Sequence, residues 1–323
     1  MRLSVCVVTY NQRAYIAQAV GSVLAQDAGF DFEIVIGDDA SDDGTSDILR
    51  QLHADNPDRL TIVSRAENLG AAENFRQTIN ACTGEYIAFL EGDDYWTSRE
   101  KLRLQVAFLD SHTDASFCFH RTRTLDSANP IAESVVPAAD PQEFPAEDFL
   151  FQSSNPVSLH TVVARRIDLE GRAAWIDDLR LGDWPLCIML AQKGRIGYIP
   201  REMSRYRVHA GGTWSQVSPH VRLIGVLQMF KKVQGLLPAS QQELAQANQT
   251  GICRWLAGEL VLNGTLPVKD FTAELAAIGD CGIATAILAD VIAVAREMHS
   301  ASVWHEQQSR AWHGVALERL KAC

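Results

Sequence analysis

The sequence lacks the two glycine-rich loops that most often bind nucleotide cofactors after a first strand. Neither G-x-G-x-x-G nor a Walker A loop follows the opening apolar run, and Thr9-Tyr10-Asn11 stands there instead. Because a dinucleotide needs those glycines for close backbone approach to its pyrophosphate, their absence argues against a nicotinamide or flavin oxidoreductase. A nucleotidyltransferase would need a glycine-rich, basic phosphate loop here, and residues 9–13 do not provide one.

Clustered cysteines and long hydrophobic runs are also missing. The seven cysteines are scattered without a C-x-x-C pair, which argues against a disulfide framework or zinc site and predicts reduced thiols. No uncharged stretch approaches the roughly 20 apolar residues of a membrane-spanning helix. The N-terminal apolar run is shorter than that of a signal peptide. We therefore expect a cytoplasmic protein without a transmembrane segment, at most peripheral at the inner face of the cell membrane.

Positive charge is scarce. The 323 residues contain 29 Lys and Arg against 40 Asp and Glu, which gives a net charge of −11. Since nucleic-acid binding needs a basic face, this balance argues against nucleic acid as the main partner. It still allows one small anionic ligand held by a metal ion and a few local cations. The chain is 47% hydrophobic, which is typical of a globular protein, and it is long enough for two domains.

The first third of the chain alternates between strand-like and helix-like patterns. Short apolar runs predict strands at residues 3–8, 32–36, 60–63 and 86–90, and apolar residues at helical spacing predict helices between them, the third over 71–81. This alternation predicts an α/β fold with a parallel sheet covered by helices on both faces. Ligands bind such sheets at the carboxyl ends of the strands, where the polar clusters after Val8, Ile36 and Leu90 fall.

The rest of the chain changes character twice. A helix around Leu102 to Leu109, another from Pro185 to Gln192 and strand-like pieces at 116–119, 161–164 and 205–208 accompany a proline-punctuated loop from Pro130 to Pro156. From Leu223 onward the pattern is almost entirely helical. We therefore expect parts at 1–115, 116–222 and 223–323. The helical region could pack on the rest, form a homodimer or lie on a membrane surface.

Two polar clusters follow the first and second strands. The first is Thr9-Tyr10-Asn11, and the second runs from Gly37 to Thr45. Carboxylates at a strand end can accept hydrogen bonds from the N–H of a base or from a ribose hydroxyl. Ser41, Asp42 and Asp43 fit capping of the next helix better, whereas Asp38 precedes the cap and fits that role less well.

A third cluster, Glu91-Gly92-Asp93-Asp94, follows the fourth strand. Three carboxylates within four residues repel one another unless a cation lies among them. Oxygen ligands favour hard Mg²⁺ or Mn²⁺, which would also neutralise a diphosphate. The alternative is a solvated acidic turn. The place of the cluster at the end of a buried strand favours the metal.

A fourth cluster combines Gly182-Asp183-Trp184, which opens a helix, with the basic segment from Arg205 to Trp214. Asp183 is either a helix cap or a general base for a substrate hydroxyl. The segment from Arg205 is the best local source of positive charge near an otherwise acidic site. Its alternative is a strand with a solvated basic face.

Together these clusters resemble a family 2 glycosyltransferase of the GT-A fold. The similarity rests on Val7 to Asn11, Ile34 to Thr45, Asn68-Leu69-Gly70, Gly84 to Leu90 and Glu91 to Trp96, with later motifs at 182–184 and 205–214. It is good over 1–115, fair to about 215 and absent beyond. The resemblance implies a Rossmann-like, mixed and mostly parallel sheet, a nucleotide-diphospho-sugar donor, a divalent metal and inversion at the anomeric carbon.

Carried over residue by residue, the resemblance implies a nucleotide-sugar site made of Thr9, Tyr10, Asn11, Asp38, Asp39, Asn68, Gly70, Glu91 and Asp93, with Asp38 at the base. Mn²⁺ or Mg²⁺ would be held by Asp93, Asp94 and His209, and Glu91 replaces the more usual Asp. Asp183 matches the catalytic base. The candidates for contact with the diphosphate or the acceptor are Arg205, Arg207, Trp184 and Trp214. Of the aromatic residues Tyr95, Trp96, Trp184 and Trp214, we expect at least two to pack in the core.

The resulting hypothesis is metal-assisted transfer of a sugar, from a UDP-sugar in the first instance, to a hydroxyl of a glycan, lipid-linked or protein-linked acceptor. Residues 1–115 would bind the donor and 116–222 would face the acceptor. Synthesis of a bacterial surface polysaccharide is the expectation at family level. The alternative is a catalytically inactive nucleotide-sugar-binding or scaffold protein of the same fold. Such a protein would be expected to lose Asp93, Asp94 or Asp183, and all three are present.

Overall fold

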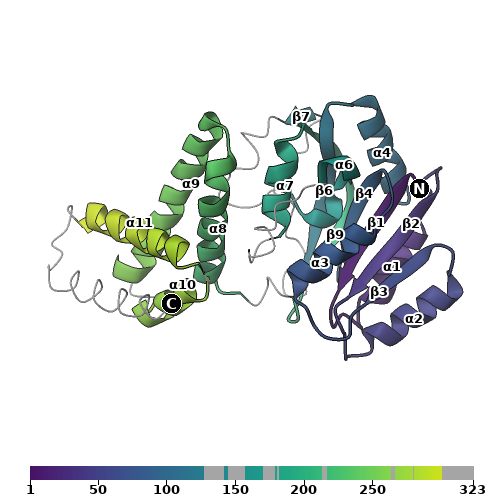
Figure 1. The fold of residues 1–323 in the computed structure, drawn as a ribbon, viewed down its shortest axis with the longest axis horizontal. Coiled ribbons are helices and arrows are strands. Elements are labelled where there is room, and N and C mark those ends of the chain that lie inside the picture. The colour runs from purple at the N-terminus through teal and green to yellow at the C-terminus, as the bar shows by residue number, and fades with distance from the viewer. Residues whose placement is uncertain are drawn as a thin grey trace. The chain divides into compact units, whose positions relative to one another are not determined.

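The computed structural model describes residues 1–126, 142–144, 157–169, 179, 182–212, 217–262, 266–278 and 280–299. These residues form two compact units, which Figure 1 draws as a ribbon. The first unit contains the sheet and the described residues up to 212, except Leu179. The second contains Leu179 and the helices from Val217 onward.

Nine strands of the described residues form one mixed, mostly parallel sheet in the first unit. They are β1 (Leu3–Thr9), β2 (Phe32–Asp38), β3 (Leu60–Ser64), β4 (Tyr86–Glu91), β5 (Tyr95–Trp96), β6 (Ala115–Asp126), β7 (Gln142–Phe144), β8 (Val163–Arg165) and β9 (Arg195–Val208). The order is β3-β2-β1-β4-β8-β6-β9-β5, and β7 also pairs with β9. Strands β1 to β4 pair in parallel, as does β6 with β9, whereas β5, β7 and β8 run antiparallel to their neighbours. The predicted fold class is confirmed.

Helices cover both faces of the sheet (Figure 1). On one face Leu3, Val5 and Val7 of β1 share a core with α1 (Ile16–Leu24), α2 (Thr45–Asp55) and α4 (Lys101–Ser111). The opposite face packs against α3 (Ala71–Ala81), where the rings of Phe75 and Phe89 lie 5.7 Å apart. Because side chains alternate along a strand, almost every position of β1, β2 and β4 is buried on one face or the other.

Sequence and structure differ at five strands. Strand β6 covers 115–126 instead of 116–119, and the strand β7 lies within the predicted loop. The two-residue strand β5 was not predicted, β9 begins ten residues before the predicted 205–208, and β8 covers 163–165 after a 3₁₀ turn, η1 (Leu159–Thr161), instead of 161–164. The helix predicted at 185–192 is α7 (Asp183–Ala191). The predicted loop from Pro130 to Pro156 lies outside the described residues, apart from β7. The division at residue 115 stays a prediction.

Gly37 lies in β2 where α3 approaches the sheet most closely. A Cβ atom there would lie 1.9 Å from Thr78 Oγ1 and 2.5 Å from Asn74 Oδ1, and both side chains are buried. We expect Gly37→Ala to lower the free energy of unfolding by about 2 kcal/mol, the usual size of an overpacking penalty. Denaturant unfolding measures this. Gly21→Ala in α1, with open space around the added methyl, is the matched control. Equal stability of the two variants would contradict the expected clash.

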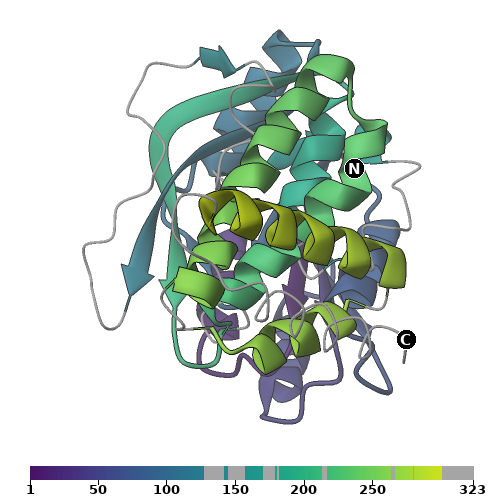
Figure 2. The same cartoon turned by 90° about the vertical axis from the view of Figure 1, so that its left-hand side faces the viewer.

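The second unit is helical, as the pattern beyond Leu223 predicts. It contains α8 (Pro219–Val233), α9 (Ala239–Ala257), α10 (Val268–Ala276) and α11 (Cys281–His299). Figure 2 shows α11 lying across α8 and α9, which it contacts, and Lys231 of α8 forms an ion pair of 2.6 Å with Asp290 of α11. Among the described helices, none has the length and apolarity needed to cross a bilayer. Association through these helices stays a prediction.

Candidate functional site

The carboxyl ends of β1, β2 and β4 meet at one edge of the sheet because these strands are parallel and in register. Thr9 pairs with Asp38, and Val8 pairs with Glu91. Backbone hydrogen bonds connect the strand ends directly after the paired residues. Asp39 N–H donates to Thr9 O at 3.1 Å, and Gly92 N–H donates to Val8 O at 2.9 Å. The structure therefore brings the first three predicted polar clusters together.

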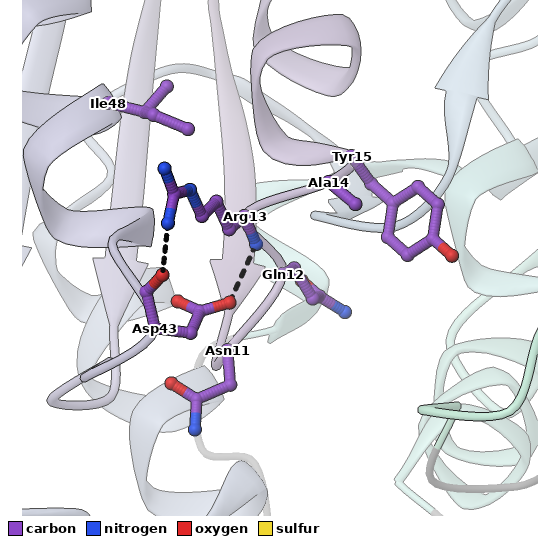
Figure 3. Close-up of a pocket in the computed structure, with 7 residues that line it drawn as sticks. All are labelled: Asn11, Gln12, Arg13, Ala14, Tyr15, Asp43 and Ile48. Atoms are coloured by element: carbon purple, nitrogen blue, oxygen red, sulfur yellow. Dashed lines mark hydrogen bonds between the residues drawn. The ribbon is translucent and has the colours of Figure 1, made fainter.

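The loop after β1 is hydrogen-bonded to the loop after β2. Asn11 has a left-handed backbone with φ of 52°. Its Nδ2 donates to Asp42 Oδ1 at 2.9 Å, and its Oδ1 accepts the backbone N–H of Asp42 at 3.0 Å. Arg13 N–H donates to Asp43 Oδ2 at 2.9 Å. Figure 3 shows the pocket beside this contact, where Arg13 and Asp43 face each other and Tyr15 points away from them. Its lining residues are Asn11, Gln12, Arg13, Ala14, Tyr15, Asp43 and Ile48.

Asp38 and Asp39 are buried and organise this region of the backbone. Asp38 Oδ1 accepts the hydroxyl of Ser41 at 2.6 Å, and Oδ2 accepts that of Ser46. The Asp39 carboxylate accepts the N–H groups of Leu69 and Gly70 at 2.8 and 2.9 Å. Both carboxylates therefore already hold loops of the site, and their predicted contacts with a nucleotide stay predictions.

Two more predicted residues join this part of the site. Asn68 Nδ2 donates to Asp39 O at 3.3 Å, which ties the loop before α3 to the loop after β2. Thr9 Oγ1 donates to Gln12 Oε1 at 2.8 Å. Gly92 passes so close to this pair that a Cβ would lie 2.3 Å from Gln12 Oε1. Tyr10 is exposed, with 46% of its surface accessible.

The acidic turn after β4 places two neighbouring aspartates opposite two different imidazoles. Asp93 Oδ2 lies 3.1 Å from His209 Nε2, which comes from the residues after β9. Asp94 Oδ2 lies 2.8 Å from His160 Nδ1 in η1, and Asp94 Oδ1 accepts the backbone N–H of Arg207 at 2.8 Å. Asp94 and His160 are each 1% exposed, and Glu91 Oε2 lies 3.9 Å from His160 Nδ1. The sequence prediction included His209 but not His160.

Negative charge accumulates at this turn. Burial raises the pKa of Glu91 well above its usual range, and the charges of Asp94, Asp93 and Asp183 raise it further. Burial and the charge of Asp94 also raise the pKa of Asp93, against the hydrogen bond from His209. Buried atoms Glu91 Oε2 and Asp94 Oδ2 have no hydrogen-bond partner among the described residues. Such unpaired oxygens, gathered with an imidazole, fit the donor set of Mn²⁺ or Mg²⁺.

Asp183 lies at the start of α7 and is half-buried. The charge of Asp183 contributes to the raised pKa values of Glu91 and Tyr206. For Tyr206 its effect is smaller than that of burial and of the three carboxylates of the acidic turn. The fold therefore brings Asp183 within electrostatic range of the acidic turn, although about ninety residues separate them in the chain. Gly182, rather than Asp183, occupies the N-cap position of α7.

The two candidate arginines are held by protein groups. The Arg207 guanidinium donates to Asp93 O and to the Gln18 side chain, and it lies 4.4 Å from the Tyr95 ring centroid. Arg205 forms an ion pair with Glu202 at 2.7 Å. Arg207 therefore fixes the acidic turn against α1, and Arg205 has its charge balanced locally. Diphosphate contact by either arginine stays a prediction.

Two of the four candidate aromatic residues belong to the core, as expected. Trp184 is 1% exposed and Trp96 is 4% exposed. Direct contact between the Trp184 ring and a ligand does not fit this burial, because the ring is covered by protein. Tyr95 is half-buried beside Arg207, and Trp214 lies outside the described residues.

His160 is the functional candidate that sequence reasoning missed. It lies in an apolar segment, Val157 to Ala164, where a single histidine carries no motif. Only the antiparallel pairing of β8 with β4 brings this segment beside the acidic turn. No signal in the sequence identifies it, because its burial and its place beside the acidic turn both come from the folded structure.

Similarity to known proteins agrees with this architecture. Residues 4–162 match the family model described as Glycosyl transferase family 2. An uncharacterized protein of Mycobacterium tuberculosis is 33% identical over 216 residues, which are 66% of this chain and 60% of that protein. The matched part therefore spans less than two thirds of this relative's own length.

Two solved structures share the fold. Residues 1–349 of TarS from S. aureus, in complex with UDP-GlcNAc, align with a TM-score of 0.62 at 17% identity, covering 94% of this chain and 93% of that chain. The mannosyltransferase PcManGT from Pyrobaculum calidifontis, in complex with GDP-Man and Mn²⁺, aligns with a TM-score of 0.57 at 19% identity, covering 99% and 85%. The match to the family model, together with the 33% identical relative, shows that the chain belongs to glycosyl transferase family 2, and the two solved structures show that it has the GT-A fold.

Proposed function

We propose that this chain transfers a sugar from a nucleotide-diphosphate donor to a hydroxyl of a glycan, lipid-linked or protein-linked acceptor, with inversion at the anomeric carbon. The observation that carries the proposal is the cluster of Glu91, Asp93 and Asp94 at the carboxyl edge of the sheet, with the charge of Asp183 near enough to raise the pKa of Glu91. Asp183 is then available as a base, while carboxylates of the acidic turn would hold a cation that neutralises the departing diphosphate. TarS with UDP-GlcNAc and PcManGT with GDP-Man support donors of this class.

In this mechanism Asp183 accepts the proton of the acceptor hydroxyl while the hydroxyl oxygen forms a bond to the anomeric carbon. The bond from that carbon to the donor diphosphate breaks in the same displacement, and the electron pair leaves with the diphosphate. A bound Mn²⁺ or Mg²⁺ would supply charge neutralisation for this leaving group. Arg207 holds the acidic turn against α1 while negative charge develops on the diphosphate. The pocket lined by Asn11 and Tyr15 borders this region through the Tyr15 ring, which lies 4.6 Å from that of His209.

A donor screen tests the proposal. Purified protein is mixed with UDP-, GDP- and dTDP-sugars in the presence of Mn²⁺, Mg²⁺ or EDTA, and Tm and donor hydrolysis are followed. We expect one donor to raise Tm in a metal-dependent way, since ligand at about 100 times its Kd stabilises by about 2.7 kcal/mol. The variant Asp93→Asn/Asp94→Asn, which keeps side-chain size, is expected to lose the shift.

The control is Asp58→Asn, an exposed carboxylate between α2 and β3, which is expected to respond as the wild type does. The alternative function, a nucleotide-sugar-binding or scaffold protein, predicts a donor-dependent rise in Tm without donor hydrolysis or transfer to any acceptor. A folded wild-type protein that responds to no donor would contradict the proposal for the nucleotide site itself.

A further inference from the structure

The two histidines at the acidic turn differ in which ring nitrogen faces the carboxylates. Gly211 N–H donates to His209 Nδ1 at 3.2 Å, so this nitrogen presents a lone pair and the ring proton of the neutral imidazole is on Nε2. Nε2 in turn lies 3.1 Å from Asp93 Oδ2. Both nitrogens of His209 are therefore engaged, and the ring acts as a hydrogen-bond donor to Asp93.

In His160 it is Nδ1, not Nε2, that faces the carboxylates. Its Nε2 lies 3.0 Å from Thr122 Oγ1, an oxygen that also accepts the Ser204 hydroxyl at 2.8 Å and has a second lone pair for an N–H donor. When Nε2 carries the proton, Nδ1 keeps its lone pair and lies 2.8 Å from Asp94 Oδ2 and 3.9 Å from Glu91 Oε2. Neither contact has hydrogen-bond geometry, and both oxygens are buried without a hydrogen-bond partner among the described residues.

We infer that Glu91, Asp94 and His160 form a divalent-cation site in which Nδ1 of His160 is the nitrogen ligand. The three donor atoms lie within 4.8 Å of one another. In an octahedral site with bonds of about 2.1 Å, adjacent donors lie about 3.0 Å apart and opposite donors about 4.2 Å apart. The two measured distances from Nδ1 match these separations. Thr122 supplies the acceptor that ligating imidazoles use to fix their second nitrogen.

This inference deepens the proposed function and rests on it for the purpose of the cation, which is to serve the donor diphosphate. It changes the ligand set implied by the family resemblance, because it replaces His209 with His160 and Asp93 with Glu91. Asp93 then keeps its hydrogen bond from His209 and is oriented by it. An imidazole ligand also makes the site prefer Mn²⁺ or Co²⁺ to Mg²⁺, because Mg²⁺ favours oxygen donors whereas Mn²⁺ and Co²⁺ accept nitrogen readily.

Metal binding by the full chain without nucleotide tests this inference separately from sugar transfer. Mn²⁺ is titrated into the protein, and free Mn²⁺ is followed by its electron paramagnetic resonance signal, with Mg²⁺ as competitor. We expect His160→Gln to weaken Mn²⁺ binding at least tenfold and to reduce the preference for Mn²⁺ over Mg²⁺. Glu91→Gln, which leaves the imidazole and Thr122 in place, is expected to weaken Mn²⁺ binding too.

His209→Gln is the matched variant and is expected to keep the Kd for Mn²⁺ within about twofold. The bound Co²⁺ form should lose intensity in its visible absorption bands in His160→Gln but not in His209→Gln. The reverse pattern, or a wild-type chain that binds no Mn²⁺ before nucleotide is added, would overturn the inference. A metal-dependent donor shift in the same protein would then leave the proposed function intact.

Discussion

Replacing Asp183 with asparagine is expected to lower kcat for sugar transfer about a thousandfold while donor affinity stays within about threefold. An amide of the same size cannot take the proton of an acceptor hydroxyl, and general bases contribute roughly 10²–10⁴ to rate. The substitution also removes one of the charges that raise the pKa of Glu91. Any change in affinity for a diphosphate donor should therefore be towards tighter binding. Steady-state transfer assays and donor titration measure the two quantities separately.

Asp58→Asn is again the matched control, because that carboxylate is exposed. A split between kcat and donor affinity is what distinguishes a base from a structural residue. If a folded Asp183→Asn protein loses donor binding and transfer together, Asp183 organises the start of α7 and is not the base. If transfer proceeds at the wild-type rate, another group takes the proton and the proposed mechanism is wrong.

The half of the fold built from local pattern could be predicted closely. The helix expected over 71–81 is α3 with the same bounds, and the strand expected over 86–90 is β4 with one more residue. These elements are buried on one stripe or on both faces, so their apolar periodicity is strong. In contrast, β9 carries Gly197, Pro200 and alternating charges, and its pairing partner β6 precedes it by about eighty residues. The pattern of apolar residues within a ten-residue window does not predict pairing with a strand so far away in the chain.

The candidate site divides in the same way. Glu91, Asp93 and Asp94 follow a buried parallel strand, so their position at the ligand-binding edge could be predicted from the strand alone. The hydrogen-bond partners that decide their roles come from distant segments: Arg207 and His209 from β9 and beyond, and His160 from η1. The engagement of Asp38 with Ser41 and Ser46 was equally hidden, because a carboxylate at a strand end looks the same whether it faces a ligand or its own loop.

Substitution of Lys101 has the second large expected effect, and no sequence pattern indicated that this residue is buried. Its side chain is fully buried in the core at the start of α4, with Nζ 4.0 Å from the centroid of the Trp96 ring and no hydrogen-bond acceptor among the described residues. Burial lowers the pKa of Lys101 from 10.5 to about 7. Cys118 and His120 face it from β6; burial raises the pKa of the Cys118 thiol to about 12 and lowers that of His120 well below its usual range. Neither group changes charge between pH 7.5 and 8.5.

The pH dependence of stability follows from this depressed pKa. Between pH 7 and pH 10.5 the unfolded chain binds a proton at Lys101 that the folded chain does not, so the free energy of unfolding rises with pH, by up to about 1.4 kcal/mol per unit. Lys101→Met keeps the length of the side chain and removes the titration. We expect this variant to be more stable than the wild type at pH 7.5, by on the order of 2–4 kcal/mol, and to show a smaller rise in stability from pH 7.5 to 8.5. Urea unfolding at the two pH values measures both quantities, with exposed Lys193→Met as the matched control. A Lys101→Met protein that is less stable than the wild type, with the same pH dependence, would mean that the ammonium group is charged in the folded state and held by the Trp96 ring.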